Sequence, residues 1–398
     1  MKKILLLIVC IHFFQSVNSQ DRVITTALPF LLVAADARAA GMADVGVATS
    51  TDAFSQQWNP AKYAFSNDQQ GFSVSYTPYL TGLVNDISLG QATYFNKISD
   101  RAAFAGSLRY FGFGDIELRQ TSDPNENVRT VSPNEFALDG SYSLKLSEKF
   151  SMAVAGRYIR SNLKVATDTG DATAANTFAI DIAGFYQSEE IAYNEFNGRW
   201  RAGFNIQNLG PKISYDNDQI NTNFIPANLK LGTGFDFILD DYNKVALNVE
   251  FSKLLVPTPQ VGYNGTTYTG TDVNNDGRID ATDFDLATQE YKSIGWVSGI
   301  FKSFGDAPQG IKEEIKEVTY AVGAEYMYQD SFAMRLGYFH ESPDKGARRF
   351  FSLGAGFKYT SVNIDVSYLF SASKIPNPLE NTLRFSLTFN FGDKYETY

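Results

Sequence analysis

Apolar and polar residues alternate along fourteen stretches of this chain, between Gln70 and Phe391. In the last stretch, 382–391, every second residue is Leu or Phe and the residues between them are polar. A period of two places the apolar side chains on one face of a β-strand, so the pattern predicts an all-β protein. The expected strands are 72–78, 87–96, 102–113, 135–146, 151–162, 176–187, 200–208, 228–238, 244–254, 317–329, 332–340, 349–359, 362–370 and 382–391.

The connections between these strands alternate in length. Those after strands 2, 4, 8, 10 and 12 are tight, and those after strands 3, 5, 7 and 9 are long, with 255–316 the longest. Short periplasmic turns and long extracellular loops are typical of an outer-membrane barrel, and a soluble sandwich has no reason to keep this alternation. We therefore predict a 14-stranded antiparallel transmembrane β-barrel over 70–398. The connection 188–199 is longer than a turn and does not fit the alternation.

The first residues resemble an export signal. Lys2 and Lys3 precede an apolar run, 4–14, which is followed by a short polar region. This order is typical of a secretory signal peptide, and the run is too short to span a bilayer. We expect the signal to cover 1–19 and to be cleaved after Ser19. The signal predicts export, and together with the barrel it predicts the cell outer membrane as the location of the chain.

The single cysteine lies inside that apolar run. Cys10 suggests a lipoprotein signal, but Val9 is bulky where that processing needs a small residue. We therefore favour ordinary cleavage, which leaves a mature chain without cysteine and without disulfide or thiol chemistry.

Composition and charge agree with a membrane barrel. The chain has 22 Tyr and 32 Phe, the residues that form interfacial girdles, and its net charge of −10 argues against binding nucleic acid. A charge in hydrocarbon costs about 2–4 kcal/mol, so charges opposite the apolar rows should face the lumen. An ordinary paired interior is favoured over a selectivity filter. The expected lumenal charges are Arg109, Arg157, Asp181, Lys230, Asp236, Glu250, Arg335, Lys358, Asp365 and Arg384.

A segment of small residues, 20–69, precedes the first strand. Fourteen strands enclose more space than their own side chains fill, so we expect this segment to plug the lumen. Its motif residues are Gly41, Asp52 and the run Asn59-Pro60-Ala61. A glycine-rich segment with these residues ahead of a fourteen-stranded barrel resembles the long-chain fatty acid transporter family, in which it forms a hatch.

The C-terminal third of the chain resembles one particular branch of this superfamily. The strings 301–308, 313–320, 323–326, 336–341, 345–346 and 377–385 resemble the PorV family of the type IX secretion system of Bacteroidota, a branch of the fatty acid transporter superfamily. That resemblance implies a shuttle rather than a pore. It would bind the giant type IX translocon barrel (SprA/Sov-like), receive cargo by its C-terminal domain and deliver it to the PorU-like sortase attachment complex. The alternative is a transporter of long-chain fatty acids or other hydrophobic molecules.

The longest loop contains one motif that is typical of a calcium site. The run 272–283 matches a calcium loop at positions 1, 3, 5, 6, 9 and 12, and Ca²⁺ requires six to eight oxygens. Asp283 replaces the usual Glu at position 12 and no helix precedes the loop, which suggests a dockerin-like variant with a short helix starting near Phe284. A polar surface turn is the alternative. The expected ligands of a structural Ca²⁺ are Asp272, Asn274, Asp276, Arg278 (through its carbonyl), Asp280 and Asp283.

Beyond this motif the same loop has an apolar stripe at helical spacing, from Ile294 to Phe304. Two interpretations are equally open: a helix that binds a partner or the membrane interface, and a helix folded over the barrel mouth. The candidate partner-facing residues are Trp296, Ile300, Phe301 and Phe304.

Catalysis finds little support in the sequence. The mature chain has one histidine, His340, and no recognisable motif places a serine beside it. A general base needs a partner to act on, so we expect that the protein is not an enzyme.

Overall fold

A computed structural model describes residues 22–82, 84–119, 128–163, 174–215, 222–373 and 379–394. The expected signal peptide with Cys10 and Ser19, the mature start at Gln20, and residues 377–378 of the family-like strings lie outside these ranges.

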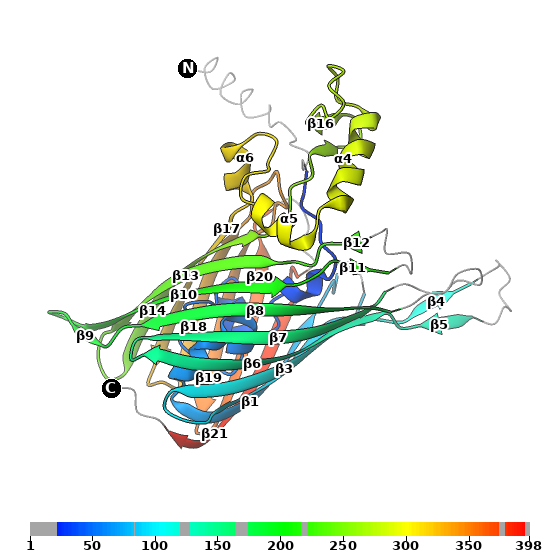
Figure 1. Ribbon diagram of the computed structural model, residues 1–398. Coiled ribbons are helices and arrows are strands. Elements are labelled where there is room, and N and C mark those ends of the chain that lie inside the picture. The colour runs from blue at the N-terminus through cyan, green and yellow to red at the C-terminus, as the bar shows by residue number, and fades with distance from the viewer. Residues whose placement is uncertain are drawn as a thin grey trace, which may run out of the picture.

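The main sheet is a closed antiparallel barrel of fourteen strands, which confirms the predicted fold (Figure 1). Each barrel strand pairs with its neighbour in the chain, β1 pairs with β21, and a pairing of β10 with β13 completes the ring. The strands are β1 (Asp68–Pro78), β2 (Ile87–Lys97), β3 (Ala102–Phe113), β6 (Asn134–Ser147), β7 (Phe150–Asn162), β8 (Ala175–Gln187), β10 (Asn197–Leu209), β13 (Asn228–Ile238), β14 (Asn243–Leu254), β17 (Thr319–Tyr328), β18 (Phe332–His340), β19 (Arg349–Tyr359), β20 (Val362–Ser371) and β21 (Leu383–Lys394).

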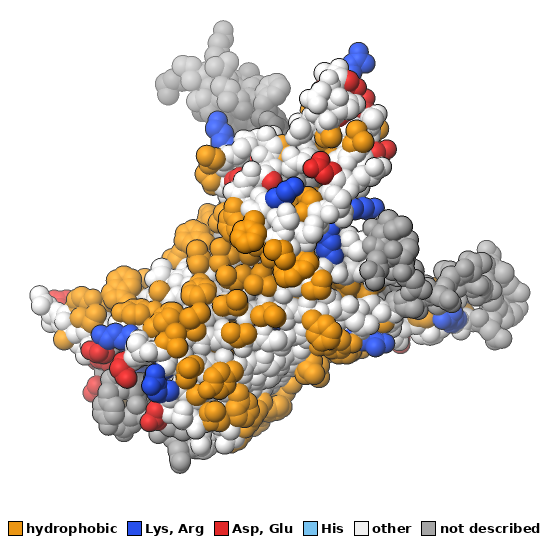
Figure 2. All heavy atoms as spheres, viewed as in Figure 1, with side chains coloured by type: hydrophobic (Ala, Val, Ile, Leu, Met, Phe, Trp, Pro, Cys, Tyr) orange, Lys and Arg blue, Asp and Glu red, His pale blue; other side chains and the backbone are white. Residues whose placement is uncertain are grey.

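Burial along the strands is inverted relative to a soluble protein. In β1, Phe72 and Tyr76 are exposed, whereas the residue after each of them, Ser73 and Thr77, is fully buried. Figure 2 shows hydrophobic side chains spread over the outside of the barrel on the face in view. Apolar side chains outside and polar ones inside match a lipid-facing surface around a polar lumen.

The two ends of the barrel differ. At one end the connections are mostly tight turns, and at the other the described residues include the small hairpins β4–β5 and β11–β12 and a helical cap (Figure 1). The cap is the long β14–β17 loop. The elements of these loops are β4 (Ile116–Leu118), β5 (Arg129–Val131), β11 (Ile213–Ser214), β12 (Thr222–Asn223), β15 (Val261–Tyr263), β16 (Tyr268–Gly270), α4 (Ala281–Ser293), α5 (Trp296–Lys302) and α6 (Ile311–Lys316).

The misfit connection 188–199 has a structural explanation. Its residues Ile191–Ala192 form the short strand β9, which pairs with the start of β10. The connection is therefore an extended hairpin at the turn end and not an extracellular loop.

The plug elements lie inside the barrel, where Figure 1 shows them in blue. Helix α2 contacts strands β18 to β21, and η2 contacts β2, β3, β6, β7 and β8 on the other side of the lumen. The plug elements are η1 (Pro29–Leu32), α2 (Ala37–Gly41), α3 (Ser55–Trp58) and η2 (Pro60–Phe65).

Three local expectations were wrong. Residue Glu317 was expected in a strand, but α6 runs to Lys316 and β17 begins only at Thr319. Helix α4 begins at Ala281, because Asp280 caps it, and not near Phe284. The stripe 294–304 is not one helix, because α5 covers only its middle. In the described part of the chain, no helix is both long and apolar enough to cross a membrane.

Candidate functional site

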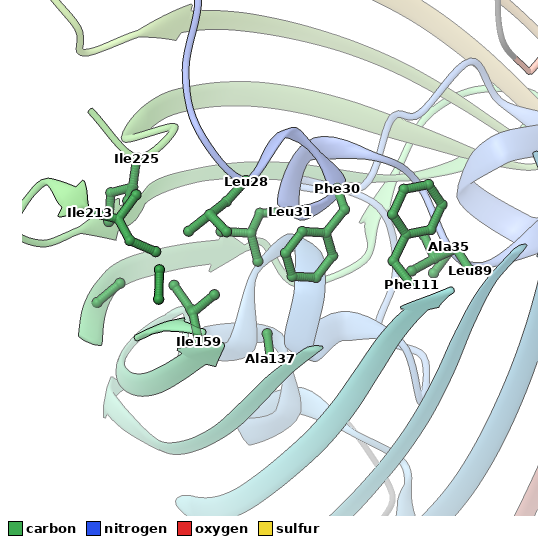
Figure 3. Close-up of a cluster of buried hydrophobic side chains, with 12 residues drawn as sticks. Leu28, Phe30, Leu31, Ala35, Leu89, Phe111, Ala137, Ile159, Ile213 and Ile225 are labelled. Atoms are coloured by element: carbon green, nitrogen blue, oxygen red, sulfur yellow. The ribbon is translucent and has the colours of Figure 1, made fainter. Parts of the chain in front are cut away.

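The upper part of the plug packs against the barrel wall through apolar side chains. Figure 3 shows Leu28 and Leu31 among the side chains of Ile159, Ile213 and Ile225. All five are buried. Because the wall residues come from β7 and the β10–β13 loop, this cluster joins the entry of the plug to the extracellular end of the barrel.

The predicted plug motif makes close backbone contacts. A Cβ on Gly41 would lie 2.9 Å from the Cα of Gly354 on β19, so only glycine lets α2 approach the wall this closely. On the other side, the Asn59 side-chain NH₂ donates to the carbonyls of Val47 and Gly184, each at 3.0 Å. Its side-chain oxygen accepts from the N–H of Ala61, which caps the helix that Pro60 begins.

Buried ion pairs tie the plug to the wall. Arg38 of α2 donates to Asp52 at 2.7 Å and to Glu325 of β17 at 2.9 Å. Glu325 also accepts from Arg335 at 2.6 Å, and Arg335 donates to Asp365 at 2.7 Å. Buried charges need such partners, so the predicted motif residue Asp52 belongs to a network that spans plug and barrel.

A second set of charges lies on β6, β7 and β8 and on β13 and β14. Arg157 pairs with Asp139 at 3.2 Å and with Asp181 at 2.8 Å. Glu250 accepts from the backbone N–H groups of Gly46 and Val47 in the plug, and pairs with Lys230 at 2.9 Å. The charges that were predicted to face the lumen thus form ion pairs with one another inside the barrel.

Several functional residues were missed by sequence reasoning. Arg38, Asp139, Arg201 and Glu325 are buried in the lumen and form ion pairs there. The last three occupy inward positions of their strands, so the period of two could have predicted that they face the lumen. Arg38 lies in the plug, where no comparable pattern exists.

A cavity of about 1020 Å³ lies between the plug and the turn end of the barrel. Its walls carry charged groups of both signs, among them Arg199, Lys244, Lys358 and Asp365. Apolar side chains such as Phe95 and Val245 lie among these charges, so the lining is mixed and differs from the mostly apolar pockets that bind hydrophobic molecules.

The cap at the other end is held to the start of the plug segment by charge. Arg22 donates to both carboxylate oxygens of Glu313 on α6 at 3.2 Å, and Lys345 pairs with the same carboxylate at 2.6 Å. Burial opposes the charged form, but hydrogen bonds from Lys345 and Arg22 lower the pKa of Glu313.

The candidate calcium loop has an all-oxygen donor set. Asp272 accepts from the N–H groups of Asp276 and Gly277, and Asp283 accepts from those of Val273 and Asn274. These backbone hydrogen bonds lower the pKa of Asp283. The remaining predicted ligands, Arg278 and Asp280, lie in the same turn and at the α4 cap.

Within the described ranges, no three His, Cys, Asp or Glu side chains converge as a metal site would require. Binding would need the carboxylates of Asp272, Asp276 and Asp283 to approach one another. The chemistry of the donors fits Ca²⁺, and calcium binding stays a prediction.

The candidate partner-facing residues divide into two groups. Phe301 and Phe304 are exposed, whereas Trp296 and Ile300 are half-buried. The one histidine among the described residues, His340, stacks on Tyr320 with ring centroids 4.8 Å apart. It therefore takes part in an aromatic contact at the end of β18.

Comparison with known proteins gives one family match. The sequence profile described as "Type IX secretion system protein PorV" matches residues 16–261, more than half of the chain. The chain belongs to the PorV family. It is thus an outer-membrane component of the type IX secretion system. The matched region includes the plug and the strands up to Val261, and the family-like strings of 301–385 lie beyond it. Among curated proteins, none matches.

Three solved structures are similar to this chain at low sequence identity. A TodX mutant described as a monoaromatic hydrocarbon channel is 12% identical, covers 89% of this chain and 98% of its own, and has a TM-score of 0.49. The Ralstonia pickettii toluene transporter TbuX is 12% identical over 91% and 100%, with a TM-score of 0.48. A Pseudomonas aeruginosa FadL homologue is 12% identical over 94% and 100%, with a TM-score of 0.42.

Proposed function

We propose that this protein is the shuttle of type IX secretion. In this role it binds the giant translocon barrel, receives secreted cargo through the cargo's C-terminal domain and delivers it to the sortase-like attachment complex at the cell surface. The work is non-covalent recognition, and no residue of the chain makes or breaks a bond.

Membership in the PorV family is the observation that carries this proposal. The geometry supports it, because the lumen is occupied by a plug that buried ion pairs such as Arg38–Glu325 fasten to the wall. A fastened plug leaves the extracellular cap and hairpins as the surfaces on which other proteins can act.

The alternative of a transporter for fatty acids or other hydrophobic molecules receives less support. The described cavity is lined with charged residues, including Arg201 and Asp236, which pair with each other. A hydrophobic molecule would gain little by leaving lipid for such a lining.

The two functions predict different phenotypes for deletion of the gene in its own bacterium. The shuttle predicts that proteins with a type IX C-terminal domain accumulate in the periplasm and disappear from the surface, and that the wild-type gene restores them. An outer-membrane protein that assembles without this system serves as the control and should be unchanged. Normal surface display together with slower uptake of a long-chain fatty acid would reject the shuttle and support the transporter.

A further inference from the structure

Helices α5 and α6 of the cap both turn apolar side chains outward, and in α6 the buried side chain is charged. In α6, Glu313 is buried while Ile311 and Ile315 are 78% and 66% exposed. In α5, Gly299 is buried against Phe224 and Pro257, while Phe301 is 75% exposed. A helix on a water-soluble surface turns its charges outward and its apolar side chains inward.

The buried side of α6 is charged and paired. Glu313 has Arg22 and Lys345, and the neighbouring Glu317 pairs with Lys253 at 2.6 Å and with Lys345 at 3.1 Å. The inner face of α6 therefore needs no apolar contact. No described element covers the outer face of the two helices and the turn after α5, whose exposed residues are Val297, Phe301, Phe304, Ile311 and Ile315.

The outer face continues the lipid-facing belt of the barrel. Helix α6 ends at Lys316 and β17 begins at Thr319, so the helix stands directly at the end of that strand. Figure 2 shows hydrophobic side chains running from the barrel wall onto the part of the cap that Figure 1 labels α5 and α6. The belt next to them includes Leu247, Phe251, Tyr320 and Val322, all exposed.

We propose that the outer faces of α5 and α6 lie in the outer leaflet of the membrane, at the boundary between headgroups and acyl chains. Phe301, Ile311 and Ile315 enter the acyl region, and the exposed Lys302 and Lys312 reach the anionic headgroups beside them. Continuity with a lipid-covered belt selects lipid over a protein as the occupant. The membrane then fixes the base of the cap and leaves α4 with the β15–β16 hairpin as its free part.

The mature chain has no cysteine, so single spin labels can report the surroundings of chosen positions. Phe301→Cys and Ile315→Cys are labelled in the full-length mature protein, reconstituted alone in phosphatidylcholine–phosphatidylglycerol vesicles. Collision rates are measured with oxygen, which concentrates in hydrocarbon, and with a water-soluble nickel chelate. Leu247→Cys on β14 gives the value for lipid and Leu286→Cys, exposed on α4, gives the value for water.

The proposal predicts an oxygen-to-nickel ratio at both cap positions several-fold above that of Leu286→Cys and approaching that of Leu247→Cys. A ratio equal to that of Leu286→Cys would overturn it, because the helices would then face water. Low collision rates with both reagents would also overturn it, because protein would cover the face. Each variant is folded if, without heating, it stays compact in sodium dodecyl sulfate and migrates faster on a gel than the heated sample. No other secretion component is present, so the result is independent of the shuttle function.

Discussion

Glu325 receives hydrogen bonds from arginines on two separate elements, Arg38 of the plug and Arg335 of the wall. The period of two along β17 indicates that its side chain points inward, as it does for the other lumenal charges. The identity of its partners could not be predicted, because Arg38 is brought to it by the path of the plug through a closed barrel.

Replacement of Glu325 by Ala should weaken the plug strongly. The substitution leaves Arg38 with Asp52 alone and Arg335 with Asp365 alone, and breaking a buried ion pair costs about 3–5 kcal/mol. Asp330→Ala is the matched control, since it breaks an exposed pair with Lys244 that is worth about 0–1 kcal/mol. Urea unfolding of the purified barrel measures both. Equal losses in the two variants would show that the lumenal network does not stabilise the fold.

The stability of the cap should depend on the protonation of Asp306. Desolvation, with Glu314 and Glu317 nearby, raises the pKa of this half-buried carboxyl from 3.8 to about 6. The folded cap therefore holds a proton between about pH 4 and 6 that the unfolded cap releases, so cap stability should fall as pH rises through this window.

Hydrogen exchange of the amides around Thr258, which donates its N–H to Asp306, tests this dependence. Exchange relative to the unfolded-chain rate should be several-fold slower at pH 5 than at pH 7. Asp306→Asn should remove the difference and protect the cap at pH 7. A wild-type cap with equal protection at both values would contradict the raised pKa.

At the scale of elements, long regular strands were predictable and short helices were not. Strand β3 agrees with its predicted range because alternation persists over its whole length. Helices of four to seven residues, such as α3, α5 and α6, are too short to show a helical period or to be stable alone. Their stability comes from contacts such as Arg22 with Glu313, which the sequence places far apart.

The loop before α4 should bind calcium and order that helix. Titration of the purified chain should give a Kd on the order of 10⁻⁴–10⁻³ M. Asp272→Ala and Asp283→Ala should each abolish binding, and Asp285→Ala, exposed on α4, should leave it unchanged. Chelation by EDTA should speed hydrogen exchange of α4 in the wild type. Absence of a binding signal at concentrations about ten times higher would reject the site and leave a polar surface turn.

At the scale of the whole molecule, the class of fold follows from two features that are visible together only along the full chain. These are the period of two and the alternation of tight turns with long loops. The closure of the ring by pairing of β1 with β21, and the way the plug contacts both sides of the lumen, depend on long-range contacts that no local pattern contains. The hairpin formed by β9 shows the limit, since the sequence marked its connection as too long for a turn but did not predict the short strand in it.

The secretion role also belongs to this scale, because it concerns the surfaces of the complete protein. Affinity purification of a tagged copy from its native outer membrane, followed by mass spectrometry, tests it most directly. A tagged outer-membrane barrel of similar abundance from another family controls for unspecific retention. The shuttle predicts recovery of a very large barrel and of secreted proteins that share a C-terminal domain. Recovery of the tagged barrel with bound lipid and without these partners would contradict it.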